Sequence, residues 1–386
     1  MKKKNSLFFD TSLIYLFVVL LLIGVRVFSY YVKTNAITSV LLNLIVQIGV
    51  MFFIPFLLYK LLRNKKSKQV FQDFNFKKIN LKAVLITILI GIIVYLLNIA
   101  VASFFNIFIT ATGYDPSFGM SSASSSYSTI QFIFDILLSA VLPGICEEFC
   151  HRGLLLNGFK QLDIKKTVIL VGFLFGLIHL NIQQVFYASV IGMFLTFLVY
   201  VTGSIIPSMI VHFMNNFIGL YLTFAQYNNL PFGNFSNNLT RILVGSDPVV
   251  VFIAILFVIG LLLGLLAYLV FVLMKNTRVK QFEDLAKKAI DKKQREELFK
   301  DFNLDANVID AENGKEIDDN VPEIIFDNEI RPNGKRGIIV DINFTNNLLA
   351  GEYFIKKPTL KEKSILYATI FIGVTVTLFT LIWGII

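Results

Sequence analysis

The sequence has few cysteines, few histidines and little charge. Among its 386 residues are two cysteines and three histidines, and only 16% of the residues are Asp, Glu, Lys or Arg. Cys146 and Cys150 are too few for the disulfide framework that holds small secreted domains together. The low charge excludes an ordinary soluble domain, in which about a quarter of the residues are charged.

Long apolar runs are what the sequence has instead. Hydrophobic residues make up 55% of the chain, and the mean hydropathy is +0.70. A run of about 20 apolar residues is long enough to cross a bilayer as a helix. Candidate spans lie near 12–32, 38–59, 83–110, 130–150, 167–181, 184–201, 204–226, 248–274 and 364–386. The sequence therefore predicts an all-α, polytopic membrane bundle of about eight to nine transmembrane helices, in which the pair 167–181 and 184–201 is short enough to be partly re-entrant.

The basic residues predict the orientation of these spans. Lysine and arginine gather before the first span and in the loops after the second, fourth and eighth. All of these positions face the cytoplasm if the N-terminus does, as the positive-inside rule requires. We therefore expect a multi-pass protein of the cell membrane whose N-terminus and residues 275–363 are cytoplasmic. Its basic residues would contact membrane lipids, and we expect no nucleic-acid partner.

The chain divides into five parts by composition. Residues 1–129 hold N-terminal transmembrane helices, 130–226 a polar-containing helical core, 227–274 a further helix, 275–363 a charged segment, and 364–386 the last helix. The charged segment has an acidic centre and two β-like runs, near 323–326 and 337–344. It is predicted to be a small cytoplasmic α/β or partly disordered insertion, and it carries no catalytic motif.

Three polar pieces interrupt the apolar core. Ionisable side chains cost several kcal/mol inside a bilayer, so they usually mark a functional site there. At about 1.5 Å per helical residue, all three pieces fall near the midplane or in the cytoplasmic half of the membrane. This agreement in depth predicts one shared pocket. The pieces are Glu147-Glu148-x-x-x-Arg152, Phe175-x-x-x-His179 and His212-x-x-x-Asn216.

The spacing within the pieces suggests their chemistry. Glu148 and Arg152 are four residues apart, so they meet on one helix face and can form an ion pair. Glu147 points about 100° away from Glu148 on a helix, toward the other helices, where a carboxylate beside a histidine is suited to act as a general base. His212 and Asn216 share a face and offer two donors to an oxyanion. The remaining piece provides an imidazole, His179, and an aromatic ring, Phe175, which we interpret as packing.

These residues resemble a known family. The stretches Glu147-Glu148-Phe-Cys-His-Arg152-Gly153, Phe175-Gly-Leu-Ile-His179 and Gly203-Ser-Ile-Ile-Pro207 with His212-Phe-Met-Asn-Asn216 are similar to the motifs of the CAAX protease and bacteriocin-processing (CPBP, or Abi) family of glutamic intramembrane endopeptidases. The resemblance covers roughly residues 130–226. The family fold is a bundle of about eight membrane helices, so the ninth span and the charged segment before it depart from that pattern.

The resemblance implies a role for each polar residue. Glu147 would activate water and His179 would help to hold it. His212 and Asn216 would form the oxyanion hole, with Glu148 and Arg152 as the supporting pair. We expect no cofactor, although a set of Glu and His side chains is also compatible with a metal ion. The implied substrate is a membrane-associated protein or peptide: prenylated tails, bacteriocin precursors, anti-sigma-type regulators and signal-peptide remnants all fit such a pocket.

Other intramembrane chemistries lack their motifs. The sequence contains no H-E-x-x-H zinc motif, no G-x-S-x-G-like serine elbow and no second intramembrane aspartate at matching depth. The remaining alternative is a membrane scaffold, immunity protein or transporter that uses the same buried Glu and His cluster without catalysis. A transporter would more typically show internal repeats, and the chain has no convincing one.

Overall fold

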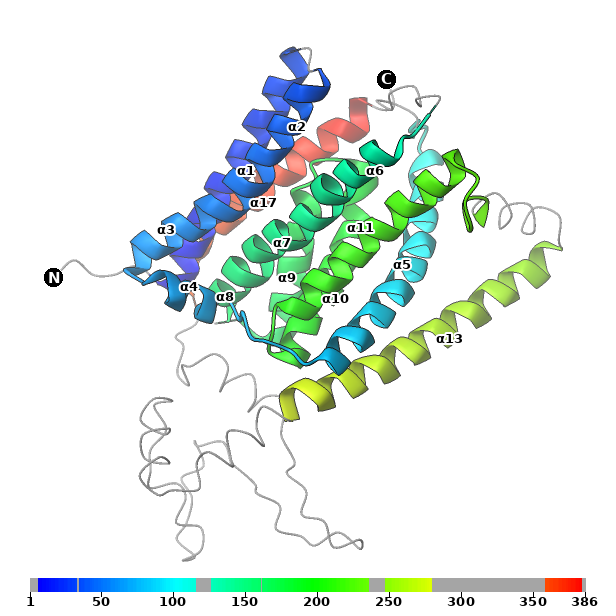
Figure 1. Cartoon of the computed structure of the whole chain (residues 1–386). Helices are drawn as coiled ribbons and strands as arrows, with labels where there is room; N and C mark the ends of the chain where they lie inside the picture. Colours follow the sequence, from blue (N-terminus) through cyan, green and yellow to red (C-terminus); the bar gives the residue numbers. More distant parts are fainter. Residues whose placement is uncertain are drawn as a thin grey trace, which may run out of the picture. The chain divides into compact units, whose positions relative to one another are not determined.

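The computed structural model describes residues 6–32, 35–115, 126–160, 162–235, 247–279 and 358–383 (Figure 1). Every regular element in these ranges is a helix, which confirms the predicted all-α class. Residues 1–273 and 358–386 form one compact unit, and 274–357 form a second. The β-like runs predicted near 323–326 and 337–344 lie outside the described residues.

Seven helices of the described residues are long and apolar enough to cross a membrane, so the chain is a multi-pass membrane protein. Two of them are continuous helices that consist of α-helical and π-helical pieces. The first, Ala36–Arg63, combines α2 (Ala36–Leu44), η1 (Ile45–Phe53) and α3 (Ile54–Arg63). The other combines α6 (Thr129–Asp135), η2 (Ile136–Val141), α7 (Leu142–Glu148), η3 (Phe149–Leu155) and α8 (Leu156–Phe159). The remaining five are α1 (Leu7–Tyr31), α5 (Leu81–Thr110), α10 (Ile182–Thr202), α13 (Pro248–Met274) and α17 (Leu360–Trp383).

Two of the nine predicted spans are not among these seven. The span predicted at 167–181 is α9 (Ile164–Leu177), whose 14 residues are too few to cross the hydrocarbon core alone. The span predicted at 204–226 is α11 (Ile206–Tyr227), which has 22 residues and is long enough. Its polar side chains, including His212, Asn215 and Asn216, lower its hydropathy. The predicted span at 204–226 thus corresponds to a helix of sufficient length, with a hydropathy lowered by the polar residues that it contributes to the cluster.

Polar caps fix where the membrane helices begin. The side chains of Ser6, Asn80 and Ser128 accept hydrogen bonds from the backbone N–H three residues on, at 3.2, 2.8 and 3.2 Å. Each bond satisfies one of the donors that the first turn of a helix leaves without a partner. At the other end of Ala36–Arg63, Asn64 adopts a left-handed conformation with φ of 53° and ends the helix. The spans therefore begin and end at capping residues, a few positions away from the edges of the apolar runs.

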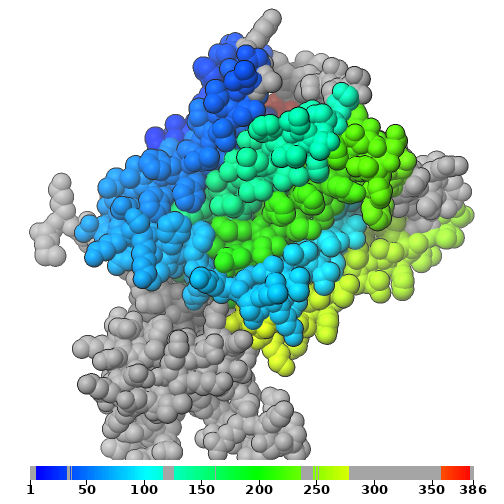
Figure 2. All heavy atoms as spheres, in the orientation of Figure 1, coloured from blue at the N-terminus to red at the C-terminus, as the bar shows by residue number. Residues whose placement is uncertain are grey.

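Three π-helical stretches lie in the two composite helices. They cover Ile45–Phe53, Ile136–Val141 and Phe149–Leu155, so the acidic pair Glu147-Glu148 lies between two of them. A π-helical stretch adds a residue to a turn and redirects the side chains that follow, and such stretches are frequent at functional sites. The stretch η1 packs against α7. In the space-filling view, the helix Ala36–Arg63, the helix Thr129–Phe159 and α11 lie side by side (Figure 2).

Helices α9 and α10 form a hairpin held by close backbone contact. A Cβ atom added at Gly192 would lie 2.8 Å from the carbonyl oxygen of Gly172 and 3.0 Å from its Cα. A Cβ at Gly172 would overlap the backbone nitrogen of Met193, and one at Gly176 would overlap the side chain of Ser189. Small residues at such positions allow membrane helices to approach closely. The hairpin therefore depends on these glycines for its separation.

We expect Gly172→Ala to destabilise the protein by about 1–3 kcal/mol, the usual cost of overpacking a tight contact. The neighbouring atom is backbone, so it cannot move aside as a flexible side chain would. Thermal unfolding of the purified protein in lipid would measure the change. The matched control is Gly264→Ala in α13, where no atom lies within 4 Å of the added Cβ. Equal melting temperatures for the two variants would contradict the prediction.

Candidate active site

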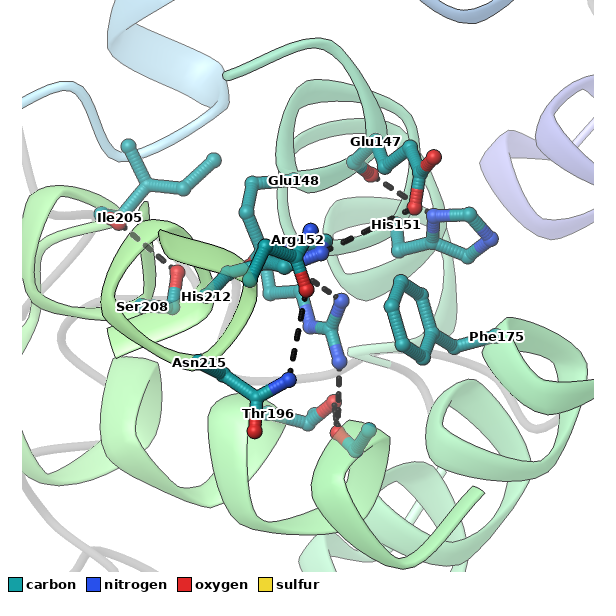
Figure 3. Close-up of polar contacts among 12 residues, drawn as sticks. Glu147, Glu148, His151, Arg152, Phe175, Thr196, Ile205, Ser208, His212 and Asn215 are labelled. Atoms are coloured by element: carbon teal, nitrogen blue, oxygen red, sulfur yellow. Dashed lines mark hydrogen bonds and ion pairs between the residues drawn. The ribbon is translucent and has the colours of Figure 1, made fainter. Parts of the chain in front are cut away.

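The ring of Phe175 brings the three polar pieces together. Its centroid lies 5.1 Å from that of His151, 5.4 Å from that of His179 and 5.4 Å from that of His212, each in an edge arrangement. The guanidinium carbon of Arg152 lies 4.4 Å from the centre of the same ring (Figure 3). All three histidines of the chain and Arg152 are therefore grouped around one aromatic side chain.

Glu148 and Arg152 form the predicted ion pair, and both are fully buried. The distance from Arg152 Nη1 to Glu148 Oε1 is 2.7 Å. Arg152 Nη2 donates a second bond to the carbonyl oxygen of Gly192, at 2.8 Å. Burying two charges is costly unless further hydrogen bonds accompany their attraction. Here those bonds tie the helix Thr129–Phe159 to α10.

His212 lies between the two carboxylates. Its Nδ1 is 2.9 Å from Glu148 Oε1, and its Nε2 is 4.0 Å from Glu147 Oε2. A carboxylate can only accept, so the hydrogen of the shorter contact belongs to Nδ1. The ring is thus fixed by Glu148, and its Nε2 is turned toward Glu147. This arrangement joins α11 to the acidic pair of α7.

The other two histidines are fixed in the same way. His151 Nδ1 lies 2.7 Å from the carbonyl oxygen of Glu147, and His179 Nδ1 lies 3.0 Å from that of Phe175. Carbonyl oxygens only accept, so both Nδ1 atoms donate and each neutral ring keeps Nε2 as an acceptor. The hydroxyl of Tyr15 on α1 lies 3.1 Å from His151 Nε2 and 2.9 Å from the carbonyl oxygen of Leu174. His151 had no predicted role. In the structure it links α1 to the helix of the acidic pair through its contact with Tyr15.

Glu147 has one further neighbour that sequence reasoning missed. Gln47, in the π-helical stretch η1, donates from Nε2 to Glu147 Oε1 at 2.9 Å. Gln47 is 7% exposed and Glu147 is 9% exposed, so this contact is largely shielded from solvent. The only signal in the sequence is a glutamine within an otherwise apolar span, and the spacing of the motifs gives no indication of it.

The turn that carries His179 is held from two sides. Arg26 on α1 donates from Nη1 to the carbonyl oxygen of His179 at 2.8 Å. The backbone N–H of Ile182, at the start of α10, donates to the hydroxyl oxygen of Thr380 on α17 at 3.1 Å. Leu180 between them has a φ of 47°, a left-handed conformation that costs a leucine roughly 1–2 kcal/mol. Neither Arg26 nor Thr380 was predicted to be near the site.

Asn216 belongs to a chain of amides on α11 and α5. Its Nδ2 donates to the carbonyl oxygen of Ser139 at 3.1 Å, and its Oδ1 accepts from Asn215 Nδ2 at 3.3 Å. Asn215 Oδ1 in turn accepts from Asn98 Nδ2 at 3.3 Å. An amide nitrogen carries two hydrogens, so Asn216 keeps a second one for another acceptor. Its side chain is thus oriented directly by Ser139 and Asn215, and through Asn215 by Asn98 on α5.

Within the described ranges, no group of three or more His, Cys, Asp or Glu side chains has the arrangement of a metal site. Cys146 and Cys150 are buried free thiols, as expected from their small number. The Nδ1 atoms of all three histidines donate to carbonyl or carboxylate oxygens, which leaves Nε2 of each ring as the nitrogen available to a ligand. The expectation that no cofactor is needed stays a prediction.

Comparison with known proteins identifies the same family as the motifs do. Residues 129–218 match the family model of Rce1-like type II CAAX prenyl endopeptidases. The matched segment contains all three polar pieces, and the predicted family is thereby confirmed for this part of the chain. The matched segment does not contain four residues that contact the site from other helices: Tyr15, Arg26, Gln47 and Thr380. No curated protein and no solved structure matches the chain.

We expect Arg152→Met to lower the free energy of unfolding by about 3–5 kcal/mol, because it leaves Glu148 buried without its counter-charge. The matched variant is the double substitution Glu148→Gln with Arg152→Met, which removes both charges and should recover a large part of the loss. Unfolding in detergent or lipid would measure both. A single variant as stable as the wild type, or a double variant no better than the single, would contradict this account of the pair.

Proposed function

We propose that this protein is a CAAX-type glutamic intramembrane protease that hydrolyses a peptide bond near the cytoplasmic membrane face. The matched family supports membrane proteolysis in general. The observation that carries the finer proposal is the geometry of His212, whose Nδ1 is bound to Glu148 and whose Nε2 faces Glu147 at 4.0 Å. A general base and an oxyanion donor are then side by side in a buried site.

Glu147 is the general base of the proposed reaction. Its carboxylate removes a proton from a water molecule, and the water oxygen attacks the carbonyl carbon of the peptide bond as that proton leaves. His179 helps to hold this water, because its Nδ1 is committed to the carbonyl oxygen of Phe175 and its Nε2 is an acceptor. The π electron pair of the substrate carbonyl moves to its oxygen, which becomes an oxyanion.

His212 and Asn216 stabilise this oxyanion. Since Nδ1 of His212 donates to Glu148, Nε2 donates only when both ring nitrogens carry hydrogen, and the two carboxylates beside the ring offset the resulting positive charge. Asn216 adds the second hydrogen of its amide nitrogen. Collapse of the intermediate breaks the C–N bond, and protonated Glu147 returns its proton to the leaving amine.

Glu148 and Arg152 are positioning residues in this proposal. Glu148 fixes the tautomer and orientation of His212, and Arg152 holds Glu148 while bound to Gly192 on α10. Their ion pair is fully buried, so it keeps its geometry while substrate and water exchange. The substrate we propose is a membrane-associated protein or peptide. The N-terminus and residues 275–363 are proposed to be cytoplasmic, on the side of the basic loops.

We expect Glu147→Gln, His179→Ala and His212→Ala each to reduce cleavage of membrane-tethered fluorogenic peptides by at least about 100-fold. The three substitutions remove the general base, the side chain that holds the water and an oxyanion donor, respectively. Purified protein in lipid would be assayed after its fold has been checked by thermal unfolding. The matched control is Asp135→Asn, an acid on the same helix whose carboxylate binds Tyr127 at 2.6 Å, away from the site. Wild-type activity in Glu147→Gln would eliminate the proposed base.

We expect the same cleavage to continue in the presence of a strong chelator, because the nucleophile is activated by Glu147. Rates before and after chelation, and after addition of zinc, would be compared on one preparation. Loss of activity on chelation, restored by the metal, would replace the glutamate mechanism with a metal-dependent one. If no peptide is cut and Glu147→Gln retains the cellular phenotype of the wild type, the motifs would instead serve the non-catalytic alternative.

A further inference from the structure

A chain of three asparagine amides connects α5 to Asn216, the proposed oxyanion donor. Asn98 Nδ2 lies 3.3 Å from Asn215 Oδ1, and Asn215 Nδ2 lies 3.3 Å from Asn216 Oδ1. Asn216 Nδ2 in turn lies 3.1 Å from the carbonyl oxygen of Ser139. Figure 3 shows Asn215 among the polar contacts of the site. The proposed mechanism assigns no role to Asn98 or Asn215, and Asn98 lies outside the segment that matches the family.

The backbone carbonyl of Ser139 determines which way every amide in this chain faces. A carbonyl oxygen only accepts, so Asn216 turns its NH₂ group toward Ser139 and its own oxygen toward Asn215. That oxygen requires a donor, so Asn215 faces it with NH₂ and turns its oxygen toward Asn98. The oxygen of Asn215 requires a donor in the same way, and Asn98 supplies it. All three amides therefore point their NH₂ groups in one direction, from α5 toward Ser139.

This direction matters because the two ends of an amide have opposite chemistry. An oxyanion is stabilised by N–H groups and repelled by a carbonyl oxygen. A side-chain amide that turns over about its last bond exchanges these two groups in space. The bonds of Asn216 to Asn215 and Ser139 oppose such a turn, because it would place oxygen against oxygen at Ser139 and NH₂ against NH₂ at Asn215. Amides in a chain also polarise one another, so an amide whose oxygen accepts a bond is a better N–H donor.

Asn98, the first member of the chain, is a costly residue for the fold. Its Oδ1 is buried and has no hydrogen-bond partner in the part of the chain that the structure describes. A buried acceptor without a partner is destabilising, and an apolar side chain of similar shape would not carry this cost. What Asn98 does provide is the donor that Asn215 Oδ1 requires. Its presence is therefore better explained by the orientation of the next amide than by stability.

We propose that Asn215 and Asn98 are positioning residues of the oxyanion hole. Asn215 holds the Asn216 amide so that its second N–H is kept for the oxyanion, and Asn98 holds Asn215 in the same sense. Both act through Asn216 and not on the substrate. Helices α5 and α11 approach closely enough to keep the chain in place, since a Cβ atom added at Gly91 would lie 2.7 Å from that of Met214. The proposal rests on the proposed proteolytic function.

The first test is a double-substitution cycle in kcat with membrane-tethered fluorogenic peptides. Asn216→Leu removes the donor itself, and we expect kcat to fall about 100-fold. Asn215→Leu removes one orienting hydrogen bond, so we expect a fall of about tenfold, with KM within about twofold of the wild type. Because Asn215 acts only through Asn216, the double variant should be no slower than Asn216→Leu alone. Independent effects that multiply to about 1,000-fold, or a wild-type kcat in Asn215→Leu, would overturn the proposal.

The second test separates orientation from stability. Asn98→Leu removes the unpaired Asn98 Oδ1 but leaves Asn215 Oδ1 without its donor, so the melting temperature in lipid should stay within about 3 °C of the wild type. We expect kcat to fall about fivefold, because Asn215 keeps only one of its two orienting bonds. The matched control is Asn106→Leu, an exposed asparagine on the same helix, which should keep the wild-type kcat. Equal kcat values in the two variants would overturn the role of Asn98.

The failure of this inference can be told apart from the failure of the proposed function. If the wild type cuts no peptide, the proposed proteolysis fails, and the role of the amide chain fails with it. If the wild type cuts and Asn215→Leu cuts equally fast, the protease stands and only the positioning role is lost.

Discussion

The buried ion pair between Glu148 and Arg152 is the interaction on which the rest of the site depends. Two charges removed from water are better tolerated when hydrogen bonds to further groups accompany their attraction. That requirement draws in His212 from α11 and the carbonyl oxygen of Gly192 from α10. The pair therefore sets the relative position of three helices, and the glycines of the α9–α10 hairpin let the backbone come close enough to take part.

The sequence predicted the parts of this arrangement that depend on local spacing. Residues four apart on a helix share a face, so the contact of Glu148 with Arg152 followed from the motif alone. The depth of the three polar pieces predicted that they meet, and the rings around Phe175 confirm it. The helical class and most membrane spans followed from apolar length. The helices α9 and α11 were also predicted from their apolar runs, although α9 has only 14 residues and neither is among the seven helices that are long and apolar enough to cross a membrane.

The contacts that sequence reasoning missed are the ones between distant helices. Gln47 and Tyr15 reach Glu147 and His151 from 100 and 136 residues away, and no periodicity records such a pairing. The π-helical stretches are equally hidden, since they change the direction of side chains without changing the composition of the span. Asn216 shows the same limit in another form. Its helix face was predicted, but its bonds to Ser139 and Asn215 depend on how α11 packs.

The turn that carries His179 has a consequence for the order in which the protein is made. Its two external supports come from distant parts of the sequence, since Arg26 is 153 residues before His179 and Thr380 is 198 residues after its partner Ile182. During synthesis, α9 and α10 enter the membrane long before α17 exists, so the first turn of α10 must wait for Thr380. The support that Thr380 gives to this turn therefore forms only after α17 has been synthesised, and a chain that stops before α17 lacks it.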